Sequence, residues 1–263
     1  MGDTHLLQAR AALSEIRREI HGRRSGFFLD LDGTLAPTVA RPDLVEIPTT
    51  TRDILGRLAK DHLVCFVSGR AIEDLQRRIG LESAFYAANH GQQIMGPPGS
   101  GIALEVGGEY AEELEAATAA LQSALLPVGG ALVETKGLSI SVHYRLVAVK
   151  ERPLVDRSVG EVAQRFPSLR LTGGKMVYEL RPPGTWNKGR AMLWLLERLA
   201  WGRHNGCPIC LGDDLTDEDM FAAAEGWGVN VVVGLPERPT RARYWLRDSD
   251  ETALFLETFV VGG

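Results

Sequence analysis

The sequence predicts an α/β protein in which a parallel sheet, with helices on both faces, carries an inserted α+β domain. From residue 27 to residue 91, short apolar runs alternate with helix-like segments, a pattern typical of parallel sheets. The breaker-rich stretch 96–101 then introduces a different pattern, in which pairs of short strands follow helices. The first pattern resumes after Pro182 and Pro183. We therefore expect a core formed by residues 1–91 and 181–263, and an inserted domain formed by residues 92–180.

The core is expected to begin with an amphipathic helix at about residues 5–21. Its apolar residues recur at spacings of three and four: Leu6, Ala9, Leu13, Ile16 and Ile20. We expect this helix to pack on the domain behind it, with a role in partner binding or oligomerisation as the alternative. The elements that follow are expected as a strand at 27–31, a helix near 50–60, a strand at 62–70, a helix at 71–79 and a strand at 85–91.

The inserted domain and the second half of the core complete this order. In the inserted domain we expect a helix near 109–126, a hairpin over 131–147 with Lys136 and Gly137 near its turn, a helix near 153–165, and strands at 169–174 and 175–182. Two pairs of strands separated by a helix suggest a small antiparallel sheet. The core is then expected to continue with a helix at 187–201, a strand at 207–214, a helix at 217–224, a strand at 227–234 and a helix at 250–259.

Composition excludes several classes of protein. The 263 residues carry a net charge of −5, which argues against a nucleic-acid-binding or membrane-surface protein. There is no signal-like apolar segment and no apolar run of about 18 residues, so we expect a cytoplasmic protein without membrane contact. The three cysteines, Cys65, Cys207 and Cys210, lie in apolar runs and are interpreted as buried strand residues. The oligomeric state is left open, and a monomer is possible.

Polar residues follow four of the expected core strands, where an open parallel sheet binds its ligands. The first strand ends in Asp30 and Asp32, and the second in Ser68 and Gly69. The third ends in the segment Asn89, His90 and Gly91, and the fourth in Asp213, Asp214 and Asp217. Lys188 begins a helix just before the fourth strand. A single pair of aspartates would be weak evidence, but this order at successive strand ends is hard to obtain by chance.

This set of residues suits phosphoryl transfer. Clustered carboxylates repel one another and need a hard cation, and oxygen ligands suit Mg²⁺. Lys188 would add positive charge, while the Ser68 hydroxyl and the Gly69 N–H could donate to phosphate oxygens. One carboxylate can attack phosphorus and form an acyl-phosphate. A second carboxylate, two residues further along an extended chain, can protonate the leaving oxygen and later activate water.

The motifs "DLDGTL" (30–35), "SGR" (68–70), "NKG" (187–189) and "GDDLTDED" (212–219) resemble the four motifs of the haloacid dehalogenase superfamily. The resemblance implies a Rossmann-like core in which Asp30 is the nucleophile and Asp32 the general acid/base, with its backbone carbonyl on Mg²⁺. Ser68 and Lys188 would bind phosphate, Asp213 would ligate Mg²⁺, and Asp214 and Asp217 would support the metal site. The acids would thus be exposed at their strand ends to do the chemistry.

The place of the insertion and its motifs narrow the resemblance. The interval between Ser68 and Lys188 holds the α+β domain, as in superfamily members with a C2-type cap, which often act on sugar phosphates. "ETKGLSISVHYR", "ANHG", "YELRP" and "GDDLTDEDMF" together resemble trehalose-6-phosphate phosphatases. That resemblance implies a disaccharide phosphate substrate. It also implies glucose contacts from Glu134, Lys136, Arg145 and Glu179, with Asn89 to Gly91 as a hinge-side substrate segment.

One departure keeps related substrates open. Gln93 stands where the family commonly has Glu after "HG", so any contact made by that acid does not carry over. The alternatives are a phosphatase of sucrose phosphate, of mannosyl-phosphoglycerate or of a trehalose-like pseudosugar phosphate. A catalytically inactive regulatory module would require loss of Asp30, Asp32, Lys188 or Asp213, and all four are present. His143 and Trp186 are interpreted as packing residues rather than sugar contacts.

Overall fold

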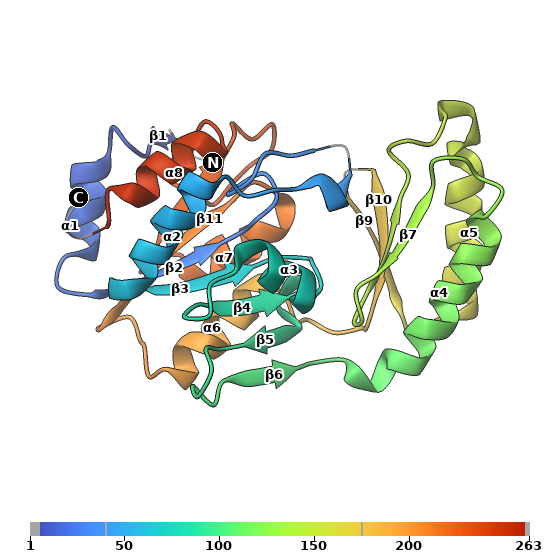
Figure 1. Cartoon of the computed structure of the whole chain (residues 1–263), viewed down its shortest axis with the longest axis horizontal. Coiled ribbons are helices and arrows are strands. Elements are labelled where there is room, and N and C mark those ends of the chain that lie inside the picture. The colour runs from blue at the N-terminus through green and yellow to red at the C-terminus, as the bar shows by residue number, and fades with distance from the viewer. Residues whose placement is uncertain (1–5, 40, 175, 261–263) are drawn as a thin grey trace. The chain divides into compact units, whose positions relative to one another are not determined.

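The computed structural model describes residues 6–39, 41–174 and 176–260, which form two compact units (Figure 1). The core unit comprises Met1–Leu104 and Trp186–Gly263, and the inserted unit comprises Glu105–Thr185. These boundaries differ from the expected ones at 91/92 and 180/181. The short strands β5 (Gln93–Met95) and β6 (Ala103–Glu105) extend the edge of the core sheet beyond β4 (Phe85–Ala88), so the chain leaves the core later than its composition suggests.

The described part of the core unit contains a nine-stranded sheet in the order β1-β13-β12-β11-β2-β3-β4-β5-β6. Its centre is parallel and consists of β2 (Arg24–Leu29), β3 (Leu63–Val67), β4, β11 (Gly206–Gly212) and β12 (Val229–Val233). The short strand β13 (Tyr244–Leu246) pairs in parallel with β12, whereas β5 pairs antiparallel with β4. The α/β class and the parallel core sheet predicted from the sequence are therefore confirmed.

Helices cover both faces of the core sheet because successive strand residues point in opposite directions. Phe27 and Leu29 pack in one apolar cluster with residues of α1 (Leu13–Ile20), α2 (Thr49–Asp61), α3 (Ile72–Ile79) and α8 (Ser249–Glu257). Phe28 packs in a second cluster with residues of α6 (Lys188–Arg198) and α7 (Glu218–Ala224). The three cysteines are free and buried in this core, as expected.

The amino-terminal segment departs from the expected single helix. The strand β1 (Leu7–Gln8) pairs in parallel with β13, and the helix α1 begins only at Leu13. Residue 5, where the helix was expected to begin, lies outside the described residues. The interpretation of this segment as a packing element is confirmed, since Ala9 and Ile16 are fully buried in the core.

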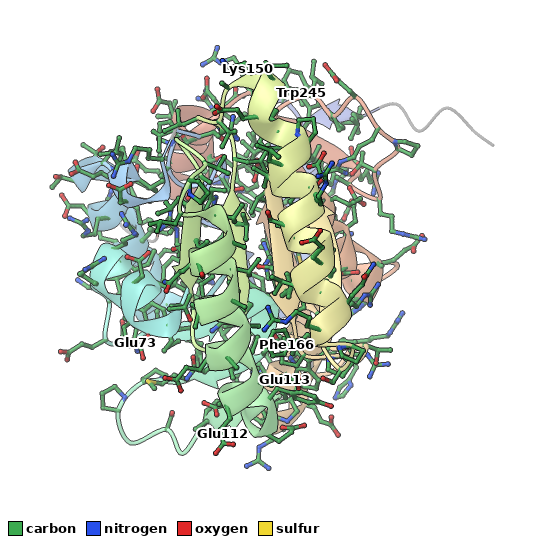
Figure 2. The ribbon with its side chains drawn as sticks, turned by 90° about the vertical axis from the view of Figure 1, so that its right-hand side faces the viewer. Glu73, Glu112, Glu113, Lys150, Phe166 and Trp245 are labelled. Carbon is green, nitrogen blue, oxygen red and sulfur yellow. The ribbon has the colours of Figure 1, made fainter. Side chains whose placement is uncertain are left out.

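The inserted unit is a four-stranded antiparallel sheet backed by two helices. The strand order is β7 (Leu132–Thr135), β8 (Ile140–His143), β10 (Val177–Arg181) and β9 (Arg170–Gly174). The helices α4 (Ala111–Leu125) and α5 (Arg152–Arg165) lie side by side and run in opposite directions (Figure 2). Their apolar faces bury Ile140, Val142 and Leu180 of the sheet in a separate hydrophobic core. Within the described residues, no helix is long and apolar enough to cross a membrane.

Candidate active site

Asp30 is the first residue after β2 and lies at the carboxyl edge of the parallel sheet. It continues the alternation of the strand, so it points to the same face as Phe28, the face that α6 covers. Asp30 is only 5% exposed, contrary to the expectation of exposed acids. The side chain of Asp32 is far more open, at 40% exposed. The nucleophile candidate therefore lies on the floor of the site, and the acid/base candidate lies nearer solvent.

Lys188 joins two of the buried carboxylates. Asn187 caps α6 by accepting a hydrogen bond from the Arg190 N–H at 2.9 Å, and this places Lys188 in the first turn. The Lys188 Nζ donates to Asp30 Oδ1 at 2.7 Å and to Asp217 Oδ1 at 2.8 Å. Because both acceptors are themselves buried, removing the ammonium would leave two uncompensated carboxylates.

The electrostatics of this cluster reflect burial and mutual repulsion. Burial lowers the pKa of Lys188, but the charges of Asp217 and Asp30 outweigh it and raise the pKa well above the ordinary range. Burial raises the pKa of Asp30, Lys188 opposes this, and the neighbouring aspartates add to it. Burial and the charge of Asp217 raise the pKa of Asp213 to about 7. The cluster thus carries more carboxylates than its one ammonium can balance.

The three aspartates that follow β11, Asp213, Asp214 and Asp217, differ in what their side chains contact. Asp217 is fully buried, and its Oδ2 accepts from the backbone N–H groups of Asp213 and Asp214 at 3.1 and 3.0 Å. Asp214 instead accepts from the Leu215 N–H at 2.6 Å and caps the short turn that follows. Asp213 is left to face Asp30, and its Oδ1 is buried without a hydrogen-bond partner within the described chain.

These acids fit a divalent cation. Asp30, Asp213 and Asp217 each offer a carboxylate oxygen, and the three oxygens lie within 4.8 Å of one another. The unpartnered Oδ1 of Asp213 is the donor that a cation would satisfy, and a cation would favour the ionised carboxylates. Gly33 is required here, because a Cβ at this position would approach Asp213 Oδ2 to 2.2 Å, and its φ is +87°. Of the five expected metal residues, the structure gathers three and directs the side chains of Asp32 and Asp214 elsewhere.

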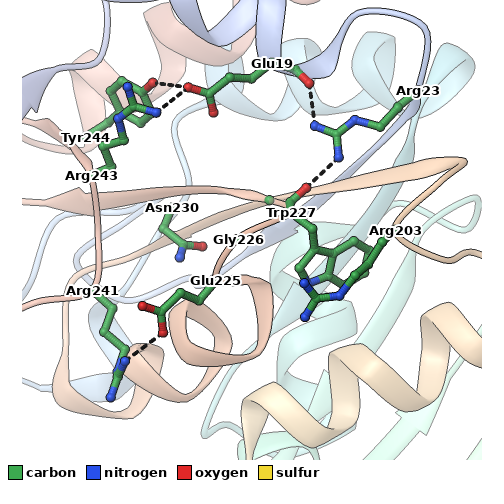
Figure 3. Close-up of a pocket in the computed structure, with 11 residues that line it drawn as sticks. Glu19, Arg23, Arg203, Glu225, Gly226, Trp227, Asn230, Arg241, Arg243 and Tyr244 are labelled. Atoms are coloured by element: carbon green, nitrogen blue, oxygen red, sulfur yellow. Dashed lines mark hydrogen bonds and ion pairs between the residues drawn. The ribbon is translucent and has the colours of Figure 1, made fainter.

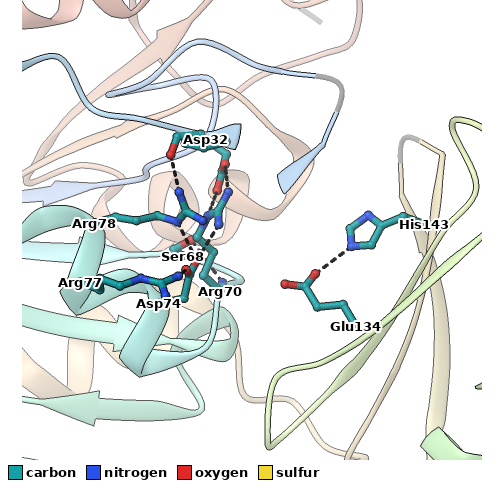
Figure 4. Close-up of polar contacts among 9 residues, drawn as sticks. Asp32, Ser68, Arg70, Asp74, Arg77, Arg78, Glu134 and His143 are labelled. Atoms are coloured by element: carbon teal, nitrogen blue, oxygen red, sulfur yellow. Dashed lines mark hydrogen bonds and ion pairs between the residues drawn. The ribbon is translucent and has the colours of Figure 1, made fainter. Parts of the chain in front are cut away.

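Arg70 holds Asp32, and sequence reasoning assigned it no role. Its Nε and Nη2 donate to the two carboxylate oxygens of Asp32 at 2.7 and 2.6 Å, and its Nη1 donates to Asp74 Oδ2 at 2.6 Å (Figure 4). Arg78 also donates to Asp74, at 2.8 Å. The signal in the sequence was the position of Arg70, directly after Ser68 and Gly69 at the end of β3. Arg70 is 7% exposed, so its guanidinium is buried within the site and is not a surface group.

The remaining phosphate and hinge candidates meet at the ends of β3 and β4. Ser68 is buried, and its backbone carbonyl accepts from the His90 N–H at 2.9 Å. A Cβ at Gly69 would lie 2.6 Å from the His90 ring, so glycine is needed for this approach. Asn89 and His90 have positive φ values of 50° and 55°, which is uncommon outside glycine. The Trp186 Nε1 donates to the Gly91 carbonyl at 2.6 Å, which supports its interpretation as a packing residue.

The expected sugar-binding residues Glu134, Lys136, Arg145 and Glu179 belong to the inserted unit. Glu134, Ser141 and Glu179 are direct partners across β7, β8 and β10, and therefore share one face of the sheet. The helices cover the opposite face, which carries Val142 and Leu180. On the uncovered face, Lys136 Nζ lies 3.7 Å from Glu179 Oε1. Arg145 follows β8 in a turn and is exposed.

His143 lies on the same uncovered face as Ser141, because residues two positions apart on a strand point to the same side. Its partners on the neighbouring strands are Leu132 and Val177. Its Nε2 is 2.8 Å from Glu134 Oε2 (Figure 4). His143 therefore packs against one of the expected sugar residues and holds its carboxylate, so the interpretation as a simple packing residue is incomplete.

The parallel core sheet with its inserted α+β unit is the haloacid dehalogenase-like fold. A solved haloacid dehalogenase-like hydrolase from Bacteroides thetaiotaomicron shares this fold, with a TM-score of 0.65 and 18% identity over 90% of this chain and 99% of that chain.

More similar proteins define the family. The sequence model of the trehalose-phosphatase family matches residues 28–250. A probable trehalose-phosphate phosphatase 3 of Oryza sativa subsp. japonica is 34% identical over 256 residues, covering 91% of this chain and 70% of that protein. The crystal structure of a trehalose-6-phosphate phosphatase related protein has a TM-score of 0.76 and 26% identity, covering 88% of this chain and 95% of that chain. The chain belongs to the trehalose-phosphatase family of phosphoric monoester hydrolases.

Proposed function

We propose that this protein hydrolyses trehalose 6-phosphate to trehalose and phosphate through an aspartyl-phosphate on Asp30. The observation that carries the proposal is the buried cluster in which Lys188 joins Asp30 to Asp217, with Asp213 alongside. The family relationship supports the choice of substrate. An inactive module is disfavoured, because Asp30, Asp32, Lys188 and Asp213 are all present and Lys188 contacts Asp30.

The chemistry follows from the placement of the two acids. Asp30 attacks phosphorus while Asp32 gives a proton to the departing sugar oxygen, so a P–O bond forms to Asp30 as the P–O bond to the sugar breaks. Asp32 then takes a proton from water as that water attacks phosphorus and frees Asp30. Lys188 offsets charge on Asp30 and on the phosphoryl oxygens, and Arg70 fixes the orientation of Asp32.

We infer that Mg²⁺ is the cation, held by Asp30 and Asp213 with the backbone carbonyl of Asp32. Carboxylate and carbonyl oxygens are its preferred ligands, and when bound it would neutralise charge on the phosphoryl group. Asp217 is already committed to Lys188 and to two backbone N–H groups, so we assign it to support of the site. Chelation with EDTA should therefore abolish activity, and added Mg²⁺ should restore it.

A panel of sugar phosphates would test the substrate assignment. Phosphate release should be fastest from trehalose 6-phosphate, and slower from sucrose 6-phosphate and mannosyl-phosphoglycerate. A faster rate with either of these would move the assignment to that sugar while leaving the phosphatase chemistry intact. Asp30→Asn keeps the shape but removes the attacking charge, so turnover of every substrate should fall by several orders of magnitude. An Asn variant that turned over at the wild-type rate would refute the covalent mechanism.

A further inference from the structure

A polar cavity lies at the edge of the core sheet opposite the acidic cluster of Asp30, Asp213 and Asp217. Its volume is about 520 Å³, and it is lined by residues near the starts of β2, β12 and β13, including Arg23, Asn230 and Tyr244 (Figure 3). The sheet is parallel through these strands, whereas Asp30 and Asp213 follow the carboxyl ends of β2 and β11. The cavity, here called the amino-edge pocket, is therefore separate from the acidic cluster.

The amino-edge pocket is rich in arginine. Four guanidinium groups line it, from Arg23, Arg203, Arg241 and Arg243, against the two carboxylates of Glu19 and Glu225. Arg203 lies 5.7 Å over the Trp227 ring and makes no hydrogen bond or ion pair within the described chain. Its five N–H donors are thus available to a ligand. A planar guanidinium donates in pairs to phosphate or carboxylate oxygens.

The other charged residues of the pocket leave it able to accept an anion. Arg241 pairs with Glu225 at 2.8 Å, but the two side chains are 54% and 64% exposed, and such pairs contribute little. Glu225 can therefore exchange Arg241 for solvent at small cost. Arg23 is committed to the Trp227 carbonyl at 2.7 Å, and Arg243 to Glu19 at 2.6 Å, so these two keep their places.

Asn230, which lines the pocket, has a side-chain acceptor that lacks a hydrogen-bond donor among the residues that the structure describes. Asn230 is 6% exposed, and its Nδ2 donates to the Phe221 carbonyl at 2.8 Å. Its Oδ1 is buried and has no hydrogen-bond partner within the described chain. A buried acceptor without a donor carries a desolvation cost that a hydroxyl group of a ligand would relieve. A phosphate ion could pair with the arginines, but it would bring fewer hydroxyl donors to Asn230 Oδ1 than a sugar phosphate does.

We propose that the amino-edge pocket is a binding site for a small anion that also carries hydroxyl groups, of the sugar-phosphate class. The anionic group binds the Arg203 guanidinium, and a hydroxyl donates to Asn230 Oδ1. This site is additional to the hydrolytic one, and it does not depend on the substrate assigned above.

The test uses calorimetric titration with glucose 6-phosphate, inorganic phosphate and glucose, with phosphate release followed in parallel to detect hydrolysis. Arg203→Gln keeps the side-chain stem over Trp227 and removes the guanidinium. The matched control is Arg198→Gln, since Arg198 lies 5.8 Å over the Trp194 ring outside the pocket. Glucose 6-phosphate should bind wild type and Arg198→Gln alike, and Arg203→Gln at least about tenfold more weakly, as for loss of a charge-assisted hydrogen bond. Turnover of p-nitrophenyl phosphate should be the same in all three proteins.

Five results would contradict the proposal. Unchanged affinity in Arg203→Gln, or equal weakening in Arg198→Gln, would show that the pocket is not the site. A parallel loss of p-nitrophenyl phosphate turnover in Arg203→Gln would assign the binding to the acidic cluster. Glucose binding as tightly as glucose 6-phosphate would exclude anion recognition. Inorganic phosphate binding as tightly as the sugar phosphate would remove the part given to Asn230.

Discussion

At the scale of single residues, a conservative substitution of Arg70 can test its pairing with Asp32. Lysine keeps the charge of arginine but cannot donate to both carboxylate oxygens in one plane. Arg70→Lys should therefore leave Asp32 poorly oriented and lower kcat for trehalose 6-phosphate by about 10- to 100-fold, the range for one or two charge-assisted hydrogen bonds. Steady-state kinetics would show the loss in kcat, with KM changed little.

Arg77→Lys is the control for this variant. Arg77 also pairs with Asp74, but its side chain is 74% exposed and it does not touch Asp32. Its replacement should leave kcat within about twofold of wild type. If both variants lost activity equally, the orientation of Asp32 would not be the reason, and a general effect on the α3 region would explain the result.

Residue types at strand ends predicted most of the candidate site. Asp30, Lys188 and Asp213 come together as expected, because parallel strands deliver their carboxyl ends to one edge. The role of Arg70 was not predictable, since an arginine after a strand looks the same whether it faces solvent or a carboxylate. The burial of Asp30 also could not be read locally, because it depends on α6, which lies far along the chain.

At the scale of elements, α3 carries an electrostatic cluster that depends on pH. Burial would raise the pKa of Asp74, but hydrogen bonds from Arg78 and Arg70 and the nearby positive charges lower it to about 2. Because this value lies below the ordinary value of 3.8, the ion pairs stabilise the fold fully above about pH 4. That stabilisation is lost as the pH falls toward 2.

Asp74→Asn should therefore destabilise the protein at pH 7, and by less as the pH falls. Urea denaturation at pH 7 and near pH 3 would measure the difference in free energy of unfolding between wild type and variant. Asp53→Asn serves as the control, since Asp53 is exposed on α2. A difference for Asp74→Asn that was the same at both pH values would mean that its charge is not what stabilises α3.

Element types were predicted better than element ends. The alternation of strands and helices in the core, and the order of helices and strands in the inserted unit, appear as expected. The strand β1 was taken for helix because two residues are too few to show a period, and only pairing with β13 makes them a strand. The strands β5 and β6 were missed for the same reason, and with them the boundary of the core unit.

At the scale of the whole molecule, recognition and chemistry should be separable. Glu134, Lys136 and Glu179 on the uncovered face of the inserted unit are proposed to contact the distal sugar. Contacts remote from the reacting centre serve to orient it. Glu179→Ala should lower kcat/KM for trehalose 6-phosphate by about 10- to 150-fold, the value of a lost hydrogen bond to a charged group. Slow hydrolysis of p-nitrophenyl phosphate should change little.

Assays of both substrates in Glu179→Ala and in Glu161→Ala would check this. Glu161 is an exposed residue of α5 in the same unit and should be neutral for both substrates. A parallel loss of both activities in Glu179→Ala would indicate a folding role for this residue, and no loss of either would mean that the sugar binds elsewhere.

The split of the core unit across the sequence bears on how the protein is made on the ribosome. β2 lies between β3, which follows soon after it in the chain, and β11, which is translated only after the whole inserted unit. The inserted unit has its own contiguous hydrophobic core and can fold as it emerges. The core unit must wait for its second segment, and contacts between such distant residues form slowly. Asp30 therefore has no Lys188 to pair with until the second segment of the core unit is translated, and the same segment supplies the missing strands of the sheet.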